Sequence, residues 1–409
     1  MNPRMVSKRG FMMVGVIYIC VVFVVLIVAF IAWSVNEYSW TMRSYLGLKA
    51  LNLADAGAEY AFWEIAHNGA AFTSWSGTNP KTFSVAGFRD NSDEPAGDIY
   101  VNVDNTSPGH YTVSSAGFVP SAANLIARRR VKVYVYPHPL FNNALFGKTS
   151  LAVTGNGVAD SYDSRLGPYS LATARSNADV GTNGAFTIDP NALVKGDVFV
   201  GPNGTLSGDV ATKVTGDVYH WGAEVELPGK TMPSYDPAIL QPPLNVSGGN
   251  ESHPKVITIP SGTCVYQSIA CSGNYSTLII PANTRLYVLG DFTVTGQARV
   301  TTYEGVEIYV GGTGNFAGQG LVNATGVPSN LQVFGTGTSP MLSFTGLNDF
   351  YGAIYAPDST VYMGGSAQFF GAAVGDDVTL AGNTTFHYDE ALSDVGPFSG
   401  YDIAYWQEE

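Results

Sequence analysis

The feature that most constrains this chain is a long uncharged run near its N-terminus. No charged residue occurs from Phe11 to Val35, and the run includes Gly15. A helix that spans a membrane needs about 20 apolar residues. The apolar region of a cleaved secretory signal is usually only about 7 to 15 residues long. The run therefore predicts one membrane-spanning helix.

The residues before this run predict how the helix is oriented. Three of them are basic and none is acidic: Arg4, Lys8 and Arg9. Because basic flanks tend to stay on the cytoplasmic side, we expect a single-pass protein of the inner membrane with a cytoplasmic N-terminus. The bulk of the chain would then be periplasmic or extracellular.

The helical pattern continues beyond the membrane segment. Good helix formers persist until Asn68-Gly69, which predicts a helix over 11–68 about 85 Å long at about 1.5 Å per residue. Small residues recur on one side of it, at Ala50, Ala54, Gly57, Ala58 and Ala61. Such a face lets another backbone approach closely. It can pack against the protein's own β domain or against helices of other subunits, and the sequence leaves both open.

These N-terminal residues resemble the type IV pilin superfamily, in particular the PilX-type pilus-assembly proteins and the K-type pseudopilins. Lys8-Arg9-Gly10-Phe11 is similar to a prepilin leader and its cleavage point, and the run from Ala50 to Ala61 is similar to the helix continuation of PilX-type proteins. The resemblance implies cleavage of the leader 1–10 between Gly10 and Phe11 by prepilin peptidase. Most pilins carry a glutamate where this chain has Gly15, and that departure favours a minor or tip-located subunit, or a protein that enters no filament.

Composition and alternation predict β structure after the helix. Glycine (47), tyrosine (23) and phenylalanine (21) are abundant, while charged residues make up only 13%. Alternating segments predict three antiparallel strands, over 98–104, 111–117 and 126–136. A long helix followed by a small antiparallel sheet resembles a pilin head, so we expect a pilin-like domain over 69–137. The basic run Arg128–Arg130 is interpreted as a solvated strand edge or a partner contact.

Residues 138–392 form a glycine-rich region with loose repeats. Aligning Phe344, Tyr362 and Leu380 gives steps of 18 residues, a spacing that suits one coil of a parallel β-helix. We therefore predict a fold that is α+β and mainly β: a transmembrane helix, a small sheet and a right-handed β-helix-like domain. A β-sandwich is the alternative. The region resembles an uncharacterised β-helical domain attached to PilX-type N-termini, and also bactofilin-like polymer-forming proteins.

Two cysteines lie close together in this region. Cys264 and Cys271 flank a short segment, and in an oxidising compartment they predict a local disulfide. A metal site is the alternative, but no further His or Cys stands near them in the sequence.

The segment His387, Tyr388, Asp389 and Glu390 is the strongest candidate for chemistry. It can hold a metal or act as acid and base, but its place after the last repeat favours a cap on the end of the coil. Parallel β-helices include polysaccharide lyases and hydrolases, yet no motif here pairs acids with a basic residue. We expect no catalytic residues, no metal site and no cofactor.

The net charge and the family resemblance restrict which functions and partners we expect. The net charge of −13 argues against a nucleic-acid partner. The resemblance implies a minor pilin-like structural or adhesive subunit, with other pilin or pseudopilin subunits and the pilus assembly machinery as partners and surface polysaccharide as a further candidate. A stationary membrane-anchored scaffold or a glycan-binding protein is the alternative. The acidic and aromatic tail, 393–409, can fold back along the helix or dock on a partner.

Overall fold

The computed structural model describes residues 8–68, 72, 74–89, 95–107, 109–395 and 398–409, and the first seven residues of the predicted leader lie outside this range. The described chain divides into two compact units. Unit 1 comprises residues 1–136 and 401–409, and unit 2 comprises residues 137–400.

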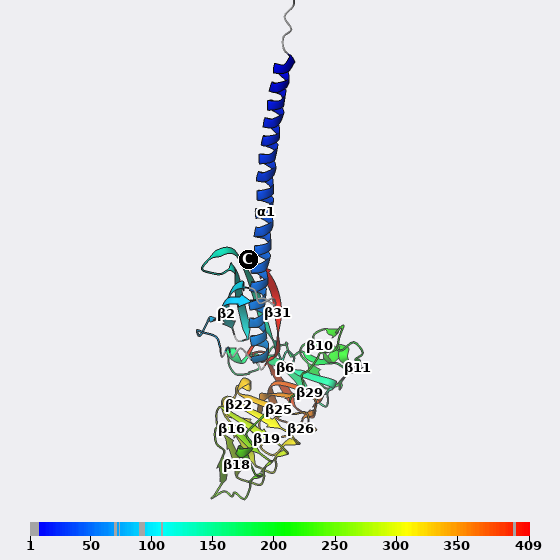
Figure 1. Cartoon of the computed structure of the whole chain (residues 1–409). Helices are drawn as coiled ribbons and strands as arrows, with labels where there is room; N and C mark the ends of the chain where they lie inside the picture. The colour runs from blue at the N-terminus through cyan, green and yellow to red at the C-terminus, as the bar shows by residue number, and fades with distance from the viewer. Residues whose placement is uncertain (1–7, 69–71, 73, 90–94, 108, 396–397) are drawn as a thin grey trace, which may run out of the picture. The chain divides into compact units, whose positions relative to one another are not determined.

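Unit 1 consists of one long helix and a five-stranded antiparallel sheet (Figure 1). Its elements are α1 (Lys8–Asn68), β1 (Lys81–Arg89), β2 (Pro95–Ser107), β3 (His110–Pro120), β4 (Leu125–Pro139) and β31 (Phe398–Glu408). The predicted helix and the three predicted strands are confirmed. Two strands were missed: β1 at one edge, and β31, which the C-terminal tail adds beside β4 at the other edge.

The alternation of β4 explains its place in the sheet. Val131, Val133 and Val135 are buried against α1, while the residues between them face outward. β4 pairs with β3 on one side and lies next to β31 on the other, and the N–H of Glu409 donates to the carbonyl oxygen of Arg130 at 2.8 Å. The run Arg128–Arg130 lies where the pairing with β31 ends and is exposed, as a solvated strand edge would be, and a partner contact stays a prediction.

Unit 2 is built from parallel strands that stack in ladders and form a nearly closed parallel sheet. The first ladder contains β13 (Leu240–Gln241), β16 (Gly262–Tyr266), β19 (Thr284–Val288), β22 (Val306–Val310), β25 (Leu331–Gly335), β27 (Phe350–Ala356), β29 (Gln368–Leu380), β5 (Leu145–Val153), β7 (Val180–Thr182), β10 (Val198–Val200) and β12 (Val218–His220). The second contains β14 (Leu244–Val246), β17 (Ile269–Cys271), β20 (Phe292–Val294), β23 (Gly314–Phe316), β26 (Met341–Phe344), β28 (Thr360–Met363), the C-terminal parts of β29 and β5, β8 (Ala185–Ile188) and β11 (Thr205–Gly208).

The remaining strands form shorter ladders. They are β15 (Lys255–Thr258), β18 (Ser276–Ile280), β21 (Arg299–Thr302) and β24 (Leu321–Asn323), and separately β30 (Thr385–Asp389), β6 (Val158–Tyr162) and β9 (Leu193–Val194). Short helices lie between strands: η1 (Ser164–Leu166), α2 (Val210–Lys213), η2 (Pro237–Ile239), η3 (Pro328–Asn330) and α3 (Leu392–Val395).

The order of strands in space differs from their order in the chain. The first strand of unit 2, β5, pairs with β29 near its end, and β6 pairs with β30. The ladders therefore continue through residues 145–220 on one side of the pairing between β5 and β29. Residues 240–389 form the ladders on the other side of this pairing.

The interior of the stack explains the repeats. Phe344, Met363 and Leu380 are buried in one interior row, at steps of 19 and 17 residues. The predicted alignment of Phe344 with Tyr362 was therefore one residue off, which places Tyr362 on the outer side because strand side chains alternate. Corners are shaped by glycine: Gly318 has φ +64°, and a Cβ there would lie 2.4 Å from the carbonyl oxygen of Gly296.

Aspartate side chains also form hydrogen bonds between successive strands of the first ladder. The backbone N–H of Asp197 donates to Oδ1 of Asp179 at 2.8 Å, and the N–H of Asp217 donates to Oδ1 of Asp197 at 2.8 Å. Asp179 and Asp197, which stand directly before β7 and β10, thus supply acceptors between successive strands of the stack.

Candidate functional site

The N-terminal half of α1 is the most exposed apolar surface in the described chain. Every side chain that the structure describes from Gly15 to Tyr45 is exposed. The most apolar 18-residue stretch of this helix has a mean hydropathy of 3.2 and no buried residue. Trp33, Tyr38 and Trp40 follow it, and such aromatics favour membrane–water interfaces. The helix is long and apolar enough to cross a membrane.

The small-residue face of α1 lies in the other half of the helix and is covered by the protein's own sheet. Its members are all buried: Ala50, Ala54, Gly57, Ala58 and Ala61. A Cβ on Gly57 would lie 2.4 Å from Oγ of Ser115 and 2.7 Å from Cγ2 of Ile99. Of the two partners left open by the sequence, the described chain places its own sheet against this face.

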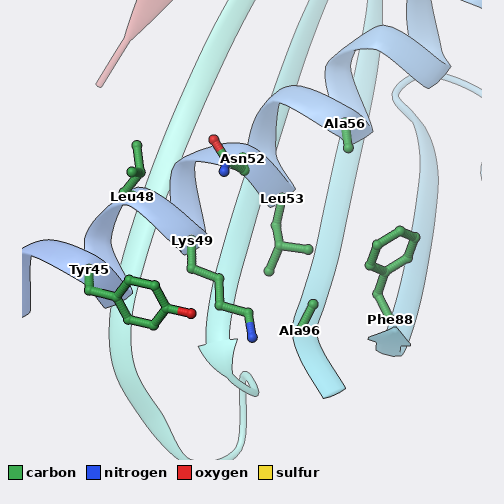
Figure 2. Close-up of a pocket in the computed structure, with 8 residues that line it drawn as sticks. All are labelled: Tyr45, Leu48, Lys49, Asn52, Leu53, Ala56, Phe88 and Ala96. Atoms are coloured by element: carbon green, nitrogen blue, oxygen red, sulfur yellow. The ribbon is translucent and has the colours of Figure 1, made fainter. Parts of the chain in front are cut away.

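A groove opens where the helix meets the sheet (Figure 2). It encloses about 300 Å³ and is lined by Tyr45, Leu48, Lys49, Asn52, Leu53, Ala56, Phe88 and Ala96. The Lys49 ammonium donates to the carbonyl oxygen of Pro95 at 3.2 Å, which ties the helix to the start of β2. The groove is mainly apolar and carries one cation.

In unit 2 the predicted cap residues lie inside the stack. The strand β30 pairs with β29 on one side and with β6 on the other. The prediction that His387, Tyr388, Asp389 and Glu390 cap an end of the coil is therefore wrong. Stacking of β6 on β30 satisfies the backbone groups that a cap would have satisfied.

His387 belongs to a buried polar cluster rather than to an open site. Its Nδ1 lies 2.5 Å from Oδ1 of Asp160, and its Nε2 lies 3.1 Å from Oε1 of Gln368. The Tyr169 hydroxyl donates to Oδ2 of Asp160 at 3.0 Å, and the Lys195 ammonium lies 3.4 Å from the same oxygen. Both ring nitrogens are thus occupied, and the side chain is only 5% exposed.

Burial and hydrogen bonding shift the pKa values of Asp160 and Asp389 in opposite directions. Burial raises the pKa of Asp160, but the hydrogen bonds from His387 and Tyr169 and the charge of Lys195 outweigh it, so the pKa is lowered. Burial raises the pKa of Asp389, and its Oδ2 has no hydrogen-bond partner in the described chain. The surroundings therefore favour the carboxylate form of Asp160 and disfavour that of Asp389. The side chains of Asp160 and Asp389 form hydrogen bonds with neighbouring strands and loops and so stabilise the packing of these segments.

The two nearby cysteines are free thiols in the structure, so the predicted disulfide is not formed. Cys264 lies on β16 in the first ladder beside Leu286, and Cys271 lies on β17 in the second ladder beside Val294. Each thiol is buried in its own row, and burial raises the pKa of both. No group of three or more His, Cys, Asp and Glu among the described residues is placed to hold a metal ion.

Sequence reasoning missed a row of aromatic side chains on the outer side of the first ladder. Tyr287, Tyr309, Phe334 and Tyr355 alternate with interior residues, yet all are buried. Residues 222–239, here called the strap, cover them. Tyr287 and Tyr309 pair across β19 and β22, and each is the fourth residue of its five-residue strand. This shared position was the signal that could have revealed the row.

Specific contacts fasten the strap. The Tyr355 hydroxyl donates to the carbonyl oxygen of Pro228 at 2.8 Å. The Lys230 ammonium lies 4.6 Å from the centre of the Phe334 ring, and its backbone carbonyl accepts from the N–H of Gly337 at 2.9 Å. The aromatic row is therefore an internal packing surface and is not open to a ligand.

Comparison with known proteins gives one family match. A model described as "Domain of unknown function (DUF7305)" matches residues 229–395, which is less than half of the chain. The match begins within the strap and ends after β30. A search of curated proteins returns no match.

Two solved structures show weak likeness to this chain. The competence-associated pilin ComZ from Thermus thermophilus is 12% identical, with 89% of this chain and 97% of that chain covered and a TM-score of 0.20. An ice-binding protein from the Antarctic ascomycete Antarctomyces psychrotrophicus is 14% identical, with 61% and 96% covered and a TM-score of 0.26. At these TM-scores neither likeness carries an argument about this chain.

Proposed function

We propose that this protein is a membrane-anchored, pilin-like structural subunit that holds a β-helical domain outside the membrane. The observation that carries the proposal is the division of α1 into two halves. The half up to Tyr45 is exposed and apolar, and the half from Ala50 packs on an antiparallel sheet. The pilin architecture that the N-terminal sequence resembles has the same division.

The proposal assigns each part a role. The exposed half of α1 anchors the protein in the inner membrane, with its N-terminus cytoplasmic, and contacts the helices of other pilin or pseudopilin subunits. Unit 2 is a β-helix without catalytic residues that presents a large, acidic surface. Since Gly15 stands where most pilins have a glutamate, the subunit is a minor one of PilX type. Its work is structural or adhesive.

The experiment is N-terminal sequencing and intact-mass measurement of the protein recovered from its native membrane. A mature chain that begins at N-methylated Phe11 is expected. A chain that retains residues 1–10 would contradict processing in the pilin pathway. A Gly10→Leu variant, which blocks the expected cleavage point, provides the matched control.

One observation favours a second function, that of a stationary scaffold. The small-residue face that would have packed against neighbouring helices is covered by the protein's own sheet. Only residues before it then remain for helix contacts, and a permanent anchor needs no such contacts. Recovery of the uncleaved chain in membranes, with none in sheared filaments, would support the scaffold.

A further inference from the structure

The turn between β3 and β4 combines exposed apolar and basic side chains. In residues 121–126, here called the β3–β4 tip, Leu125 is 53% exposed and Ile126 is 66% exposed. The exposed run Arg128–Arg130 follows after Ala127. A chain with a net charge of −13 and only 20 lysines and arginines places three of them in succession here.

The tip is held in shape by its own hydrogen bonds. The N–H of Ala122 donates to Oδ2 of Asp98 at 2.7 Å, and the N–H of Asn124 donates to Oγ of Ser121 at 3.1 Å. The Arg128 guanidinium lies 5.3 Å from the centre of the Phe118 ring. The apolar side chains are therefore presented to solvent by an ordered turn.

Strand register places the tip toward the exposed half of α1. Gly117 of β3 lies against Ala50 and Leu53, whereas Ser115 lies against Gly57. Moving along β3 toward the tip thus means moving along α1 toward its N-terminus. Figure 1 shows the exposed part of α1 continuing beyond the sheet in this direction.

The distance to the apolar segment follows from standard geometry. Arg129 pairs with Gly117, and its guanidinium lies next to Gly47. Gly117, the partner of Arg129, lies against Ala50. From Ala50 to Val35 the helix rises about 23 Å, and from Arg129 to Leu125 the strand extends about 13 Å. The backbone of the tip therefore reaches to within about 10 Å of the level of Val35, and the interfacial layer of a bilayer is about 5–7 Å thick on each side.

One further basic residue, Arg43, lies on α1 between Val35 and Gly47. Two acidic side chains of the tail partly balance the run, since Glu408 lies 3.1 Å from Arg129 and Glu409 lies 3.6 Å from Arg130. Arg128, the arginine of the run nearest to the tip, takes part in neither of these pairs.

We propose that the β3–β4 tip docks on the membrane surface, with Leu125 and Ile126 inserted between lipids and Arg128 attracted to anionic phospholipid headgroups. The inference rests on the membrane insertion of α1 but not on cleavage of the leader or entry into a filament. Docking would fix the angle of unit 1 on the bilayer, because the helix and the tip would provide two separate points of attachment.

The test uses the full chain in nanodiscs of phosphatidylcholine, with or without phosphatidylglycerol. An environment-sensitive nitrobenzoxadiazole label is attached at Ala123→Cys, in a chain that also carries Cys20→Ala. The buried thiols of Cys264 and Cys271 remain. A label at Ser107→Cys, beyond the opposite end of β3, is the positional control.

We expect the emission at position 123 to shift to the blue and to be quenched by bromolipids in the phosphatidylglycerol discs. High salt should reverse the shift, and the label at position 107 should not respond. Leu125→Ser with Ile126→Ser should abolish the shift. Because one basic residue near an anionic surface contributes about a fivefold factor in binding, Arg128→Gln should lower the docked-to-free ratio about fivefold.

Matched controls are Leu171→Ser and Leu347→Ser, which replace exposed leucines of unit 2 and should change nothing. Hydrogen exchange in β2 and β3 verifies that the tip variants remain folded. A label at position 123 that stays in water in every disc would overturn the proposal, while retention of the chain in the disc would still support the anchor. A shift that requires another membrane protein would also overturn it, because the tip would then bind protein.

Discussion

Replacing Gly57 with alanine tests whether the small-residue face serves the protein's own fold. The added Cβ would lie 2.4 Å from Oγ of Ser115, 2.7 Å from Cγ2 of Ile99 and 2.9 Å from Cγ2 of Val101. Overpacking of this kind costs about 1–3 kcal/mol, whereas alanine gains about 1 kcal/mol over glycine in a helix. Gly57→Ala should therefore lower the stability of the contact between α1 and the sheet by up to about 2 kcal/mol.

Gly47→Ala is the matched control on the same helix. Its added Cβ would meet only the flexible end of the Arg129 side chain, at 3.2 Å. The helix gain is the same in both variants, so their difference isolates the packing cost of about 1–3 kcal/mol. This corresponds to a difference of about 5- to 150-fold in the local opening equilibrium.

Hydrogen exchange measured by mass spectrometry on the full chain in nanodiscs reads this equilibrium directly. Peptides that cover 50–61 should exchange faster in Gly57→Ala than in Gly47→Ala. Equal protection in the two variants would refute the packing argument. It would instead indicate that the face is open and available to helices of other subunits.

Four further predictions concern unit 2. Cys264 and Cys271 should react with a thiol reagent only after denaturation, and an oxidised sample that shows a disulfide by mass would contradict the structure. Asp160→Asn should lower stability at neutral pH by about 1–3 kcal/mol, with the deficit vanishing as pH falls through the lowered pKa of Asp160. Asp389→Asn should gain stability relative to the native chain as pH rises above 3.8, the ordinary pKa of an aspartate, because the raised pKa of Asp389 means that its carboxylate destabilises the fold. Denaturant titrations of the Asp160 and Asp389 variants at several pH values check these two predictions. Tyr355→Phe should leave the Pro228 carbonyl unpaired and speed exchange in the strap, whereas Tyr362→Phe, on the outer side, should not.

The sequence determined the elements whose signal is local. An uncharged run of helix formers predicts a helix because each turn is closed by hydrogen bonds within the same segment. The alternation before Tyr136 predicted β4 because one face of that strand is buried. Glycine-rich repeats at steps of 18 residues indicated short stacked strands in residues 138–392, since this spacing suits one coil of a parallel β-helix.

Tertiary structure alone decided which segments meet. The tail pairs with β4, β6 stacks on β30, and the strap covers an aromatic row, and each contact joins segments far apart in the sequence. Strand pairing uses backbone groups that every residue carries, so a strand's own residues do not name its partner. For this reason His387 was expected at an end of the stack and lies within it. A small-residue face likewise specifies close approach but not the surface that approaches.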